Sequence, residues 1–357
     1  MAPTPALTLD VAGRSVRVSS PDRVVFPDIG ATKADVARYY AMVGERLLTA
    51  LGDRPTTLER WPKGVLPGMT LGDEGFYSKR TPRGAPEWVE SVRITFPSGR
   101  SADEVCPTAP AVAVWAAQMG TITFHPWPVR RPDVDHPDQL RLDFDPSPGT
   151  GFSDAVAVAL AARDLLGELG WTAYVKTSGG RGVHVFVPLQ PRWTFVEVRH
   201  AVIGIARELE RRQPDRVTTS WWKEDRGARV FVDFNQAARD RTMASAWSIR
   251  ARAGAPVSVP VGWDELASVD PATFDIFTAP ERLAMADPWA SMAAQAFDLQ
   301  PALDLWQADA DRGLTDLPYP PDYPKMPGEP LRVQPSRARK QPDDARVDPD
   351  ASDAHDH

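Results

Sequence analysis

Three aspartates form the pattern in this chain with the clearest chemical meaning. Asp143 and Asp145 lie one residue apart in the apolar run 142–146, and Asp233 lies in a second apolar run, 230–234. Side chains two apart on a strand point the same way, so Asp143 and Asp145 should project together. Three converging carboxylates would bind one or two divalent cations, and such pairs carry out phosphoryl transfer. A D-x-D pattern alone is more often a solvent-facing strand end, so the neighbouring motifs decide between the two interpretations.

A glycine-rich segment, Thr-Ser-Gly-Gly-Arg-Gly-Val-His-Val at 177–185, lies between two apolar runs. Glycines permit positive φ and leave backbone N–H groups uncovered, which suits a phosphate-binding nest. Ser178 adds a hydroxyl and Arg181 a cation, while His184 faces away from the valines of the following strand. An ordinary hairpin with a surface arginine is the alternative. The segment lacks the GK[ST] ending of a P-loop.

Other candidate residues are weaker when each is taken by itself. On a predicted strand, Ser248, Arg250 and Arg252 share one face. The two arginines would suit the oxygens of a triphosphate, and a solvated edge strand is the alternative. His125 ends an apolar strand, a position where a lone histidine is more often packed than functional. Segment 76–80, Phe-Tyr-Ser-Lys-Arg, mixes aromatics with cations and suits a template base, although aromatics in strands usually belong to the core.

A last pair of cations lies near the N-terminus. Arg23 precedes Lys33, which falls in the first turn of a predicted helix, where the dipole disfavours a cation. A bound phosphate would reconcile the two charges, and an exposed loop lysine is the ordinary alternative. The sequence has no HExxH motif, cysteine cluster or GxSxG elbow, which argues against zinc and serine-nucleophile chemistry.

The hydrophobic pattern predicts the elements that must position these residues. Thr32 and Asp35 should form the capping box of a helix that runs to Leu51. The remaining N-terminal elements are strands at 57–61, 75–80, 88–96 and 121–124 and a helix at 110–120. The later elements are strands at 141–145, 173–176, 183–187 and 228–234, helices at 153–169 and 194–212, and weaker helices at 263–267 and 280–285. From residue 141 the elements follow the order strand, helix, strand, strand, helix, strand. This order predicts an α/β (α+β) fold close to a ferredoxin-like or RNA-recognition-motif sheet.

Composition sets broad limits on the type of protein. With 357 residues, 42% of them hydrophobic, the chain can form one large domain or two smaller ones. The single cysteine, Cys106, excludes an internal disulfide, and neither a signal peptide nor a membrane-spanning run is visible, so a soluble intracellular protein is expected. Residues 341–357 carry −5 of the net charge of −7, which leaves a near-neutral body whose charge neither supports nor excludes nucleic acid. Residues 318–357, Pro-rich and then acidic, are predicted to be a disordered tail that follows one domain, 1–317.

Taken in order, these segments resemble the polymerase domain of bacterial ligase D, in the archaeo-eukaryotic primase superfamily. The resemblance covers roughly residues 18–300 and rests on these segments: Arg23…Lys33, Arg54-Pro55, Gly75–Lys79, Phe124–Trp127, Leu142–Pro146, Lys176–His184, Val230–Phe234 and Ser248–Arg250. The length and the lack of a ligase KxDG motif make the chain similar to stand-alone actinobacterial relatives. The resemblance implies a primase-polymerase fold, with an N-terminal α/β subdomain at about 1–110 and a catalytic core at about 111–300.

The resemblance also implies a role for each matched residue. The metal ligands and catalytic residues for two Mn²⁺ or Mg²⁺ ions would be Asp143, Asp145 and Asp233. The nucleotide would be bound by His125, Ser178, Gly180, Arg181, His184, Arg226 and Arg250. The DNA would be contacted by Arg23, Lys33, Arg54, Phe76, Tyr77 and Lys79, with Arg23 and Lys33 on the 5′-phosphate across a gap.

The implied activity is template-dependent addition of rNTPs or dNTPs to a primer 3′-hydroxyl, which would fill short gaps in DNA repair or end joining. The implied partners are gapped or 5′-phosphorylated DNA, nucleotides, a DNA ligase and Ku, for a monomeric protein of the bacterial cytoplasm that associates with the nucleoid and not with membranes. Family members usually have Lys where Arg23 and Arg181 stand, and Gln-Asn-Ala-Arg-Gly where residues 236–240 read Gln-Ala-Ala-Arg-Asp. Two alternatives stay open, a metal-dependent nuclease or phosphohydrolase and a non-catalytic nucleic-acid-binding relative.

Overall fold

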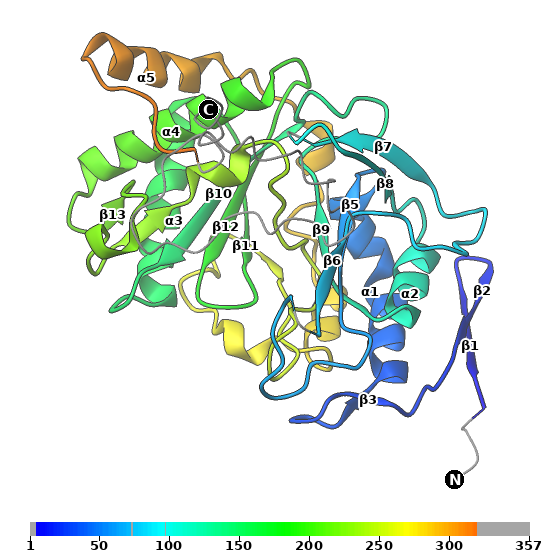
Figure 1. Cartoon of the computed structure of the whole chain (residues 1–357). Coiled ribbons are helices and arrows are strands. Elements are labelled where there is room, and N and C mark those ends of the chain that lie inside the picture. The colour runs from blue at the N-terminus through cyan, green and yellow to red at the C-terminus, as the bar shows by residue number, and fades with distance from the viewer. Residues whose placement is uncertain (1–4, 73, 97, 320–357) are drawn as a thin grey trace, which may run out of the picture. The chain divides into compact units, whose positions relative to one another are not determined.

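The sheet that carries Asp143 and Asp145 has the predicted strand order. The computed structural model describes residues 5–72, 74–96 and 98–319. Strands β10 (Gln139–Pro146), β11 (Tyr174–Thr177), β12 (Val183–Pro188) and β14 (Val230–Val232) form an antiparallel sheet in the order β14-β10-β12-β11. Short strands β13 (Val217–Thr218) and β15 (Pro260–Val261) extend its two edges. The fold is therefore α+β, with a βαββαβ unit at its centre (Figure 1).

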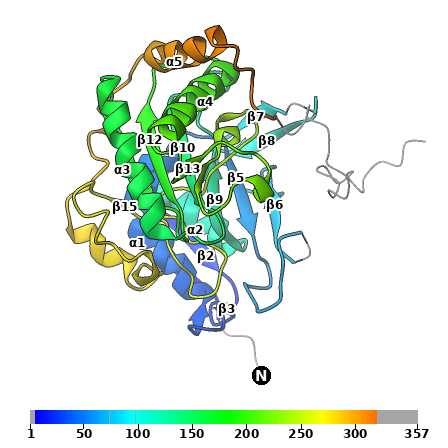
Figure 2. The ribbon, with the colours of Figure 1, turned by 90° about the vertical axis from the view of Figure 1, so that its left-hand side faces the viewer.

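Two helices cover one face of this sheet. Helices α3 (Phe152–Glu168) and α4 (Phe195–Arg212) lie together in front of it in Figure 2 and share its hydrophobic core. Leu142 and Phe144 of β10 are fully buried in that core, as their alternation with Asp143 and Asp145 predicts. The aspartates therefore lie on the sheet face that the helices leave open.

Predicted helix starts are confirmed by their capping geometry. The Thr194 hydroxyl accepts a hydrogen bond from the Glu197 N–H, and the Glu197 carboxylate accepts one from the Thr194 N–H, which completes the capping box of α4. Thr32 and Asp35 form the same pair at α1 (Lys33–Leu51). Helix α2 (Pro110–Gln118) begins with proline at its first turn.

The N-terminal half forms a second sheet against α1 and α2. Its path is β6-β5-β8-β7, and β9 pairs with β5 on the other side of that strand. The bounds of these strands are β5 Thr56–Arg60, β6 Phe76–Ser78, β7 Ser91–Thr95, β8 Ser101–Val105 and β9 Thr121–Pro126. The remaining N-terminal strands form two small hairpins, β1 Leu7–Val11 with β2 Arg14–Val18, and β3 Val24–Phe26 with β4 Ala31–Thr32. Helices α1 and α2 contact closely at Gly44, where a Cβ would lie 2.6 Å from Pro110 Cβ.

Several predicted elements differ from the structure. Residues 263–267 form turns instead of a helix, and the predicted helix at 280–285 is a 3₁₀ segment, Ala279–Ala284. Segment 248–252 is irregular, with one isolated bridge from Ile249 and a positive φ at Trp247. Strand β8 and helix α5 (Gln300–Asp311) were not predicted. The predicted tail lies outside the described residues from 320 onward, and residues up to Leu317 form one compact unit.

No helix within the described ranges combines the length and the apolar character that crossing a bilayer requires.

The second sheet holds a buried acid whose ionisation should control stability. Glu104 on β8 is 1% exposed and accepts a hydrogen bond from Thr57 Oγ1 at 3.1 Å. Burial raises the pKa of Glu104 from 4.5 to about 7. The neutral carboxyl is therefore favoured by folding, so this stabilisation is complete below 4.5 and disappears as pH rises through about 7.

We expect Glu104→Gln to stabilise the protein above neutral pH. The wild-type free energy of unfolding should fall by roughly 2–3 kcal/mol more than that of the variant between about pH 5 and pH 9. Urea denaturation at a series of pH values measures this difference. Parallel curves for the two proteins would show that Glu104 keeps an ordinary pKa.

Candidate active site

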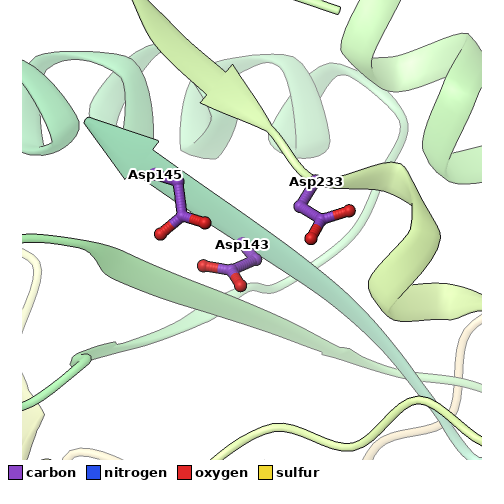
Figure 3. A group of neighbouring side chains, drawn as sticks. All are labelled: Asp143, Asp145 and Asp233. Atoms are coloured by element: carbon purple, nitrogen blue, oxygen red, sulfur yellow. The ribbon is translucent and has the colours of Figure 1, made fainter. Parts of the chain in front are cut away.

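The three aspartates come together on the face of the β14-β10-β12-β11 sheet that lies away from helices α3 and α4. Asp143 and Asp145 project from β10, and Asp233 follows the end of β14, which pairs with β10 (Figure 3). One carboxylate oxygen from each residue lies within 4.8 Å of the others. The backbone N–H of Asp233 donates to the Asp143 carbonyl at 2.9 Å, which fixes the third acid against the first pair. The predicted convergence is thus present in the fold.

A short 3₁₀ segment, Phe234–Ala237, aims the third acid. Strand β14 ends at Val232, so Asp233 lies just after the strand and not within it, as the predicted strand at 228–234 would have placed it. The Asp233 carboxylate caps this segment by accepting from the Asn235 N–H at 3.0 Å, and it also accepts from Gln236 Nε2 at 3.3 Å. The backbone of Asp233 is therefore held by its bond to β10, and its carboxylate is oriented by the turn that follows.

The cluster is electrostatically strained without a cation. Burial raises the pKa of Asp143 to about 6, and the charge on Asp143 together with burial raises that of Asp145 to about 6. Burial and both neighbouring carboxylates raise the pKa of Asp233 to about 7. Three acids that repel one another at close range are stabilised by a shared divalent cation.

The donor set fits a hard divalent cation. All three ligands are oxygens, which Mg²⁺ and Mn²⁺ prefer. Asp143 Oδ1 is buried and has no hydrogen-bond donor within the described residues, so its lone pairs are free to coordinate. The aspartates therefore supply both the charge and the open coordination that such an ion requires.

The glycine-rich loop lies directly beside the acids. Ser178 Oγ accepts from the Gly182 N–H at 3.1 Å, and a Cβ on Gly182 would lie 2.9 Å from the Phe144 carbonyl and 3.5 Å from Asp145 Oδ1. Only glycine at 182 lets the loop approach β10 this closely. Arg181 is exposed at the tip of the loop, where its guanidinium can reach a bound anion.

Arg250 connects the loop to the segment that follows the sheet. Its Nη1 donates to the Ser178 carbonyl at 2.8 Å, and a Cβ on Gly179 would lie 2.6 Å from Arg250 Cγ. A Cβ on Gly180 would lie 2.8 Å from Arg252 Nη1. Loop and arginines therefore form one surface, although the arginines stand on an irregular segment and not on the predicted strand.

His184 lies between the loop and the acids. Its Nε2 is 3.3 Å from Asp143 Oδ1, and its Nδ1 is 2.8 Å from the Nζ atom of Lys176, which the structure adds to the site. Burial holds the pKa of the His184 imidazole well below its usual value. Sequence reasoning missed Lys176 as a functional candidate, although it sits two residues before Ser178 and opposite His184 on a strand.

His125 has a carboxylate partner that was also not predicted. Its Nε2 lies 2.9 Å from Glu59 Oε2, and the Tyr77 ring packs edge-on against it at 5.3 Å. Trp61 Nε1 donates to the other Glu59 oxygen at 3.0 Å. Strand pairing of β5 with β9 brings this pair together, a contact between distant segments that no local pattern indicates. Arg250 is close enough to lower the pKa of the His125 imidazole, after the larger effect of burial.

Arg226 lies near two of the acids, Asp145 and Asp233. Its guanidinium carbon lies 3.5 Å from the centre of the Phe231 ring, and its side chain donates to the carbonyls of Ser220 and Trp221. Burial lowers the pKa of Arg226, and the nearby charges of Asp233 and Asp145 oppose that effect. The guanidinium therefore lies within electrostatic reach of the cluster.

Arg23 and Lys33 lie next to each other at the start of α1. The Lys33 N–H donates to the Arg23 carbonyl at 2.8 Å, and Lys33 Nζ donates to the Ser19 carbonyl at 2.9 Å. Lys33 is only 6% exposed, and burial with the neighbouring Arg23 charge lowers its pKa to about 8. An anion between the two cations would relieve that cost.

The template candidates lie on the exposed edge strand β6. Phe76 and Tyr77 are 42% and 47% exposed. Arg60 lies over the Phe76 ring at 5.3 Å. Lys79 forms an ion pair with Asp240 and lies over Phe96, so a DNA contact would require that pair to open.

Arg54 does not have the predicted surface position. Its side chain is 1% exposed, and its guanidinium binds both Asp138 carboxylate oxygens and the Val129 carbonyl. A guanidinium that is buried inside the protein and paired with Asp138 cannot reach a DNA phosphate on the surface. We therefore withdraw Arg54 from the set of DNA contacts and assign it a structural role.

Residues 32–289 match the model of a protein family described as LigD, primase-polymerase domain. The chain belongs to this family. The LigD primase-polymerase model spans the N-terminal sheet from α1 onward, the β14-β10-β12-β11 sheet and the three aspartates, so it covers both halves of the candidate site.

Relatives and a solved structure agree with the family match. The chain is 35% identical over 286 residues to the multifunctional non-homologous end joining protein LigD of Pseudomonas aeruginosa, covering 79% of this chain and 33% of that protein. The Mycolicibacterium smegmatis LigD is 30% identical over 339 residues, 94% of this chain and 43% of the relative. The chain thus spans only a third to under half of these relatives.

The polymerase domain of Mycobacterium tuberculosis ligase D in complex with DNA is similar in structure. Its TM-score is 0.71 at 29% sequence identity, over 79% of this chain and 99% of that chain.

Proposed function

We propose that the protein is a template-directed nucleotidyltransferase that adds ribo- or deoxyribonucleotides to a primer 3′-hydroxyl. The observation that carries this proposal is the meeting of three carboxylates with a glycine-rich loop that presents Ser178, Arg181 and His184. The acids provide a cation site and the loop provides donors for phosphates, which are the two parts that nucleotidyl transfer requires.

Each group has a separate task in this mechanism. Asp143, Asp145 and Asp233 would hold two Mg²⁺ or Mn²⁺ ions, which lower the pKa of the primer hydroxyl and stabilise charge on the α-phosphate. The Ser178 hydroxyl, the backbone N–H groups of Gly180 and its neighbours, and the Arg181 and Arg250 guanidiniums bind the triphosphate oxygens. Arg226 balances the charge of Asp145 and Asp233, and His125 lines the nucleotide site.

A role in non-homologous end joining is supported by the names of the relatives, and gap filling as its task is supported by the paired cations Arg23 and Lys33. Arg23 and Lys33 would bind the 5′-phosphate across a gap, while Phe76 and Tyr77 stack on the template. Lys79 would follow the DNA backbone once released from Asp240. A DNA ligase and Ku are the partner proteins that such a reaction would need, because filled ends must still be held and sealed.

Primer extension tests the proposed activity directly. Labelled primer on a template should lengthen with NTPs and Mn²⁺ or Mg²⁺, and chelation of the metal should stop the reaction. The same DNA without nucleotides should stay intact. Shortening of the DNA under that condition would identify a nuclease, and binding without either reaction would identify a non-catalytic relative.

Lys33→Met should abolish discrimination between gaps with and without a 5′-phosphate. A charge-assisted contact to a phosphate is worth about tenfold or more in affinity, so wild-type extension should favour the phosphorylated gap by that factor. Relative extension rates on the two gapped duplexes measure this preference. Lys63→Met is the matched control, since Lys63 is 67% exposed and pairs with Glu74. An unchanged ratio in Lys33→Met would contradict the assignment.

A further inference from the structure

Arg199 joins the turn that carries the third acid to the end of the compact unit. Its side chain is 7% exposed, and its Nε atom donates to Asn235 Oδ1 at 3.0 Å. Its Nη1 atom donates to the two Asp316 carboxylate oxygens at 2.8 and 3.0 Å, and its Nη2 atom donates to the Leu317 carbonyl at 2.7 Å. One buried guanidinium of α4 therefore binds two segments that lie far apart in the sequence.

The first of these segments is the Asp233 turn, which we define as residues 233–237. The Asn235 N–H donates to the Asp233 carboxylate at 3.0 Å, so the orientation of that carboxylate depends on where Asn235 lies. Arg199 holds Asn235 through its side-chain oxygen, and the guanidinium also lies over the Phe234 ring at 5.5 Å. Both Phe234 and Asn235 are buried. The two residues that follow Asp233 thus contact one arginine inside the protein.

The second segment is the C-terminal strap, residues 313–317, which follows helix α5. Helix α5 lies next to α4 in both views (Figures 1 and 2), and the two are in close contact at Gly204, where a Cβ would lie 2.8 Å from the Trp306 backbone nitrogen. Arg207 of α4 donates to the Thr315 carbonyl of the strap. The strap is therefore attached to α4 at Arg207 as well as at Arg199.

The charge of Asp316 keeps the strap paired with Arg199. Burial acts to raise the pKa of Asp316, but hydrogen bonds from His200 and Arg199 outweigh it and lower the pKa to about 2. Asp316 is thus ionised at neutral pH. A guanidinium is planar, so its donor directions are fixed relative to one another. When the strap holds one side of Arg199, the Nε–H on the other side points to Asn235 in a fixed direction.

We propose that Arg199 is a positioning residue that holds the Asp233 turn in the geometry that cation binding requires, and that the C-terminal strap holds Arg199 in place. This inference rests on the proposed cation site at the three aspartates. Without Arg199 the turn would lose its contacts at Asn235 and Phe234, and the Asp233 carboxylate would sample orientations that point away from the other two. A segment beyond the family match, which ends at residue 289, thereby contributes to the site without touching the cation.

Mn²⁺ binding to the full chain, without nucleotide or DNA, tests this role without a measurement of activity. Electron paramagnetic resonance of the free ion gives the dissociation constant. Arg199→Met should weaken Mn²⁺ binding about tenfold, the lower end of the effect of residues that orient metal ligands from behind. Asp316→Asn keeps the arginine and removes its charged partner, so it should weaken binding about threefold.

Arg211→Met is the matched control for loosening of the contact between the two helices. Arg211 lies further along α4 and binds Asp309 of α5 at 2.8 Å. Among the residues that the structure describes, its hydrogen bonds and ion pairs are to Asp309 and Glu208 and not to the Asp233 turn. The dissociation constant of Mn²⁺ should therefore stay unchanged in Arg211→Met.

Hydrogen exchange of the metal-free protein gives a second, local readout. The Asn235 amide is bonded to Asp233, and it should exchange about tenfold faster in Arg199→Met than in the wild type because the turn opens more often. The Ile205 amide lies in the middle of α4 and should exchange at the same rate in both proteins. An equal acceleration at Ile205 would show that α4 loosens as a whole, which would overturn the specific role of Arg199.

Other results would also overturn the proposal. These are unchanged Mn²⁺ affinity in Arg199→Met, an equal loss of affinity in Arg211→Met, or an Asn235 amide that exchanges at the wild-type rate. If Arg199→Met does not fold, Asp316→Asn decides the question, because the Asp316 side chain is 49% exposed and its substitution leaves the core intact. Wild-type Mn²⁺ affinity in Asp316→Asn would refute the support by the strap.

Failure of this inference can be distinguished from failure of the proposed function. Mn²⁺ binding that depends on Arg199, in a protein that never extends a primer, would reject nucleotidyl transfer and keep the role of Arg199. Primer extension by the wild type, together with unchanged Mn²⁺ binding in Arg199→Met, would do the reverse. A wild-type protein that binds no Mn²⁺ would overturn both.

Discussion

Asp143→Asn should abolish primer extension, with a loss of about a thousandfold or more. Asn keeps the size of the side chain and removes the charge that holds a divalent cation, which provides several kcal/mol of transition-state stabilisation. Asp233→Asn should have an effect of the same order, since its ligand oxygen lies within 4.8 Å of those of Asp143 and Asp145. Single-turnover extension at saturating nucleotide and metal measures the loss in the chemical step.

The loss of primer extension in Asp143→Asn should not come from unfolding, because the substitution is expected to keep or raise stability. Burial raises the pKa of Asp143 to about 6, so the ionised carboxylate destabilises the metal-free protein. Asp143→Asn should therefore keep or raise Tm in the presence of a chelator. Asp164→Asn is the control, because Asp164 is 64% exposed on α3, away from the cluster, and pairs with its neighbour Arg163. An Asp143→Asn protein with near-normal extension would remove the basis of the proposed function.

Arg54→Met should destabilise the fold by about 3–5 kcal/mol. The substitution breaks a buried ion pair and leaves the Asp138 carboxylate without its main partner. The Arg54 guanidinium donates to both Asp138 oxygens, one at 2.8 Å, and 1% of the Arg54 side chain is exposed. Burial and this contact act in opposite directions on Asp138, and the net effect lowers its pKa. Chemical denaturation of the two proteins gives the difference in free energy of unfolding.

The same carboxylate provides the matched control. Arg130 also binds Asp138, at 2.8 Å, but its side chain is 45% exposed, so Arg130→Met should cost about 1 kcal/mol or less. DNA affinity per folded molecule should stay unchanged in Arg54→Met. A stable Arg54→Met protein with weakened DNA binding would restore the surface role that the sequence suggested.

These two residues show what the sequence could and could not predict. Asp143 and Asp145 were identified because alternation along a strand is a local property, and the apolar neighbours Leu142 and Phe144 set which way the acids face. Arg54 was assigned through its place in a motif, and a motif does not report burial. Its partner Asp138 lies 84 positions away, and only the folded chain brings them together.

The same distinction separates the confirmed elements from the missed ones. Helices with a capping box, such as α1 and α4, were predicted to within a residue of their observed starts, because the signal is contained in four neighbouring residues. Pairs such as Glu59 with His125 and Lys176 with His184 depend on strand register, which a single sequence does not specify. Helix α5 was missed because only Ala302 and Asp309 among its residues are buried, which leaves a weak apolar pattern.

The location of Arg250 and Ser258 limits how far the protein can be shortened. Both residues lie beyond the βαββαβ unit, yet Arg250 holds the Ser178 carbonyl and Ser258 holds Lys176. Strand β15 then pairs with β11 and closes that edge of the sheet. A truncated version that stopped at Asp240 would retain all three acids and lose the support of the glycine-rich loop, so a fragment that keeps the whole candidate site must extend past Val261.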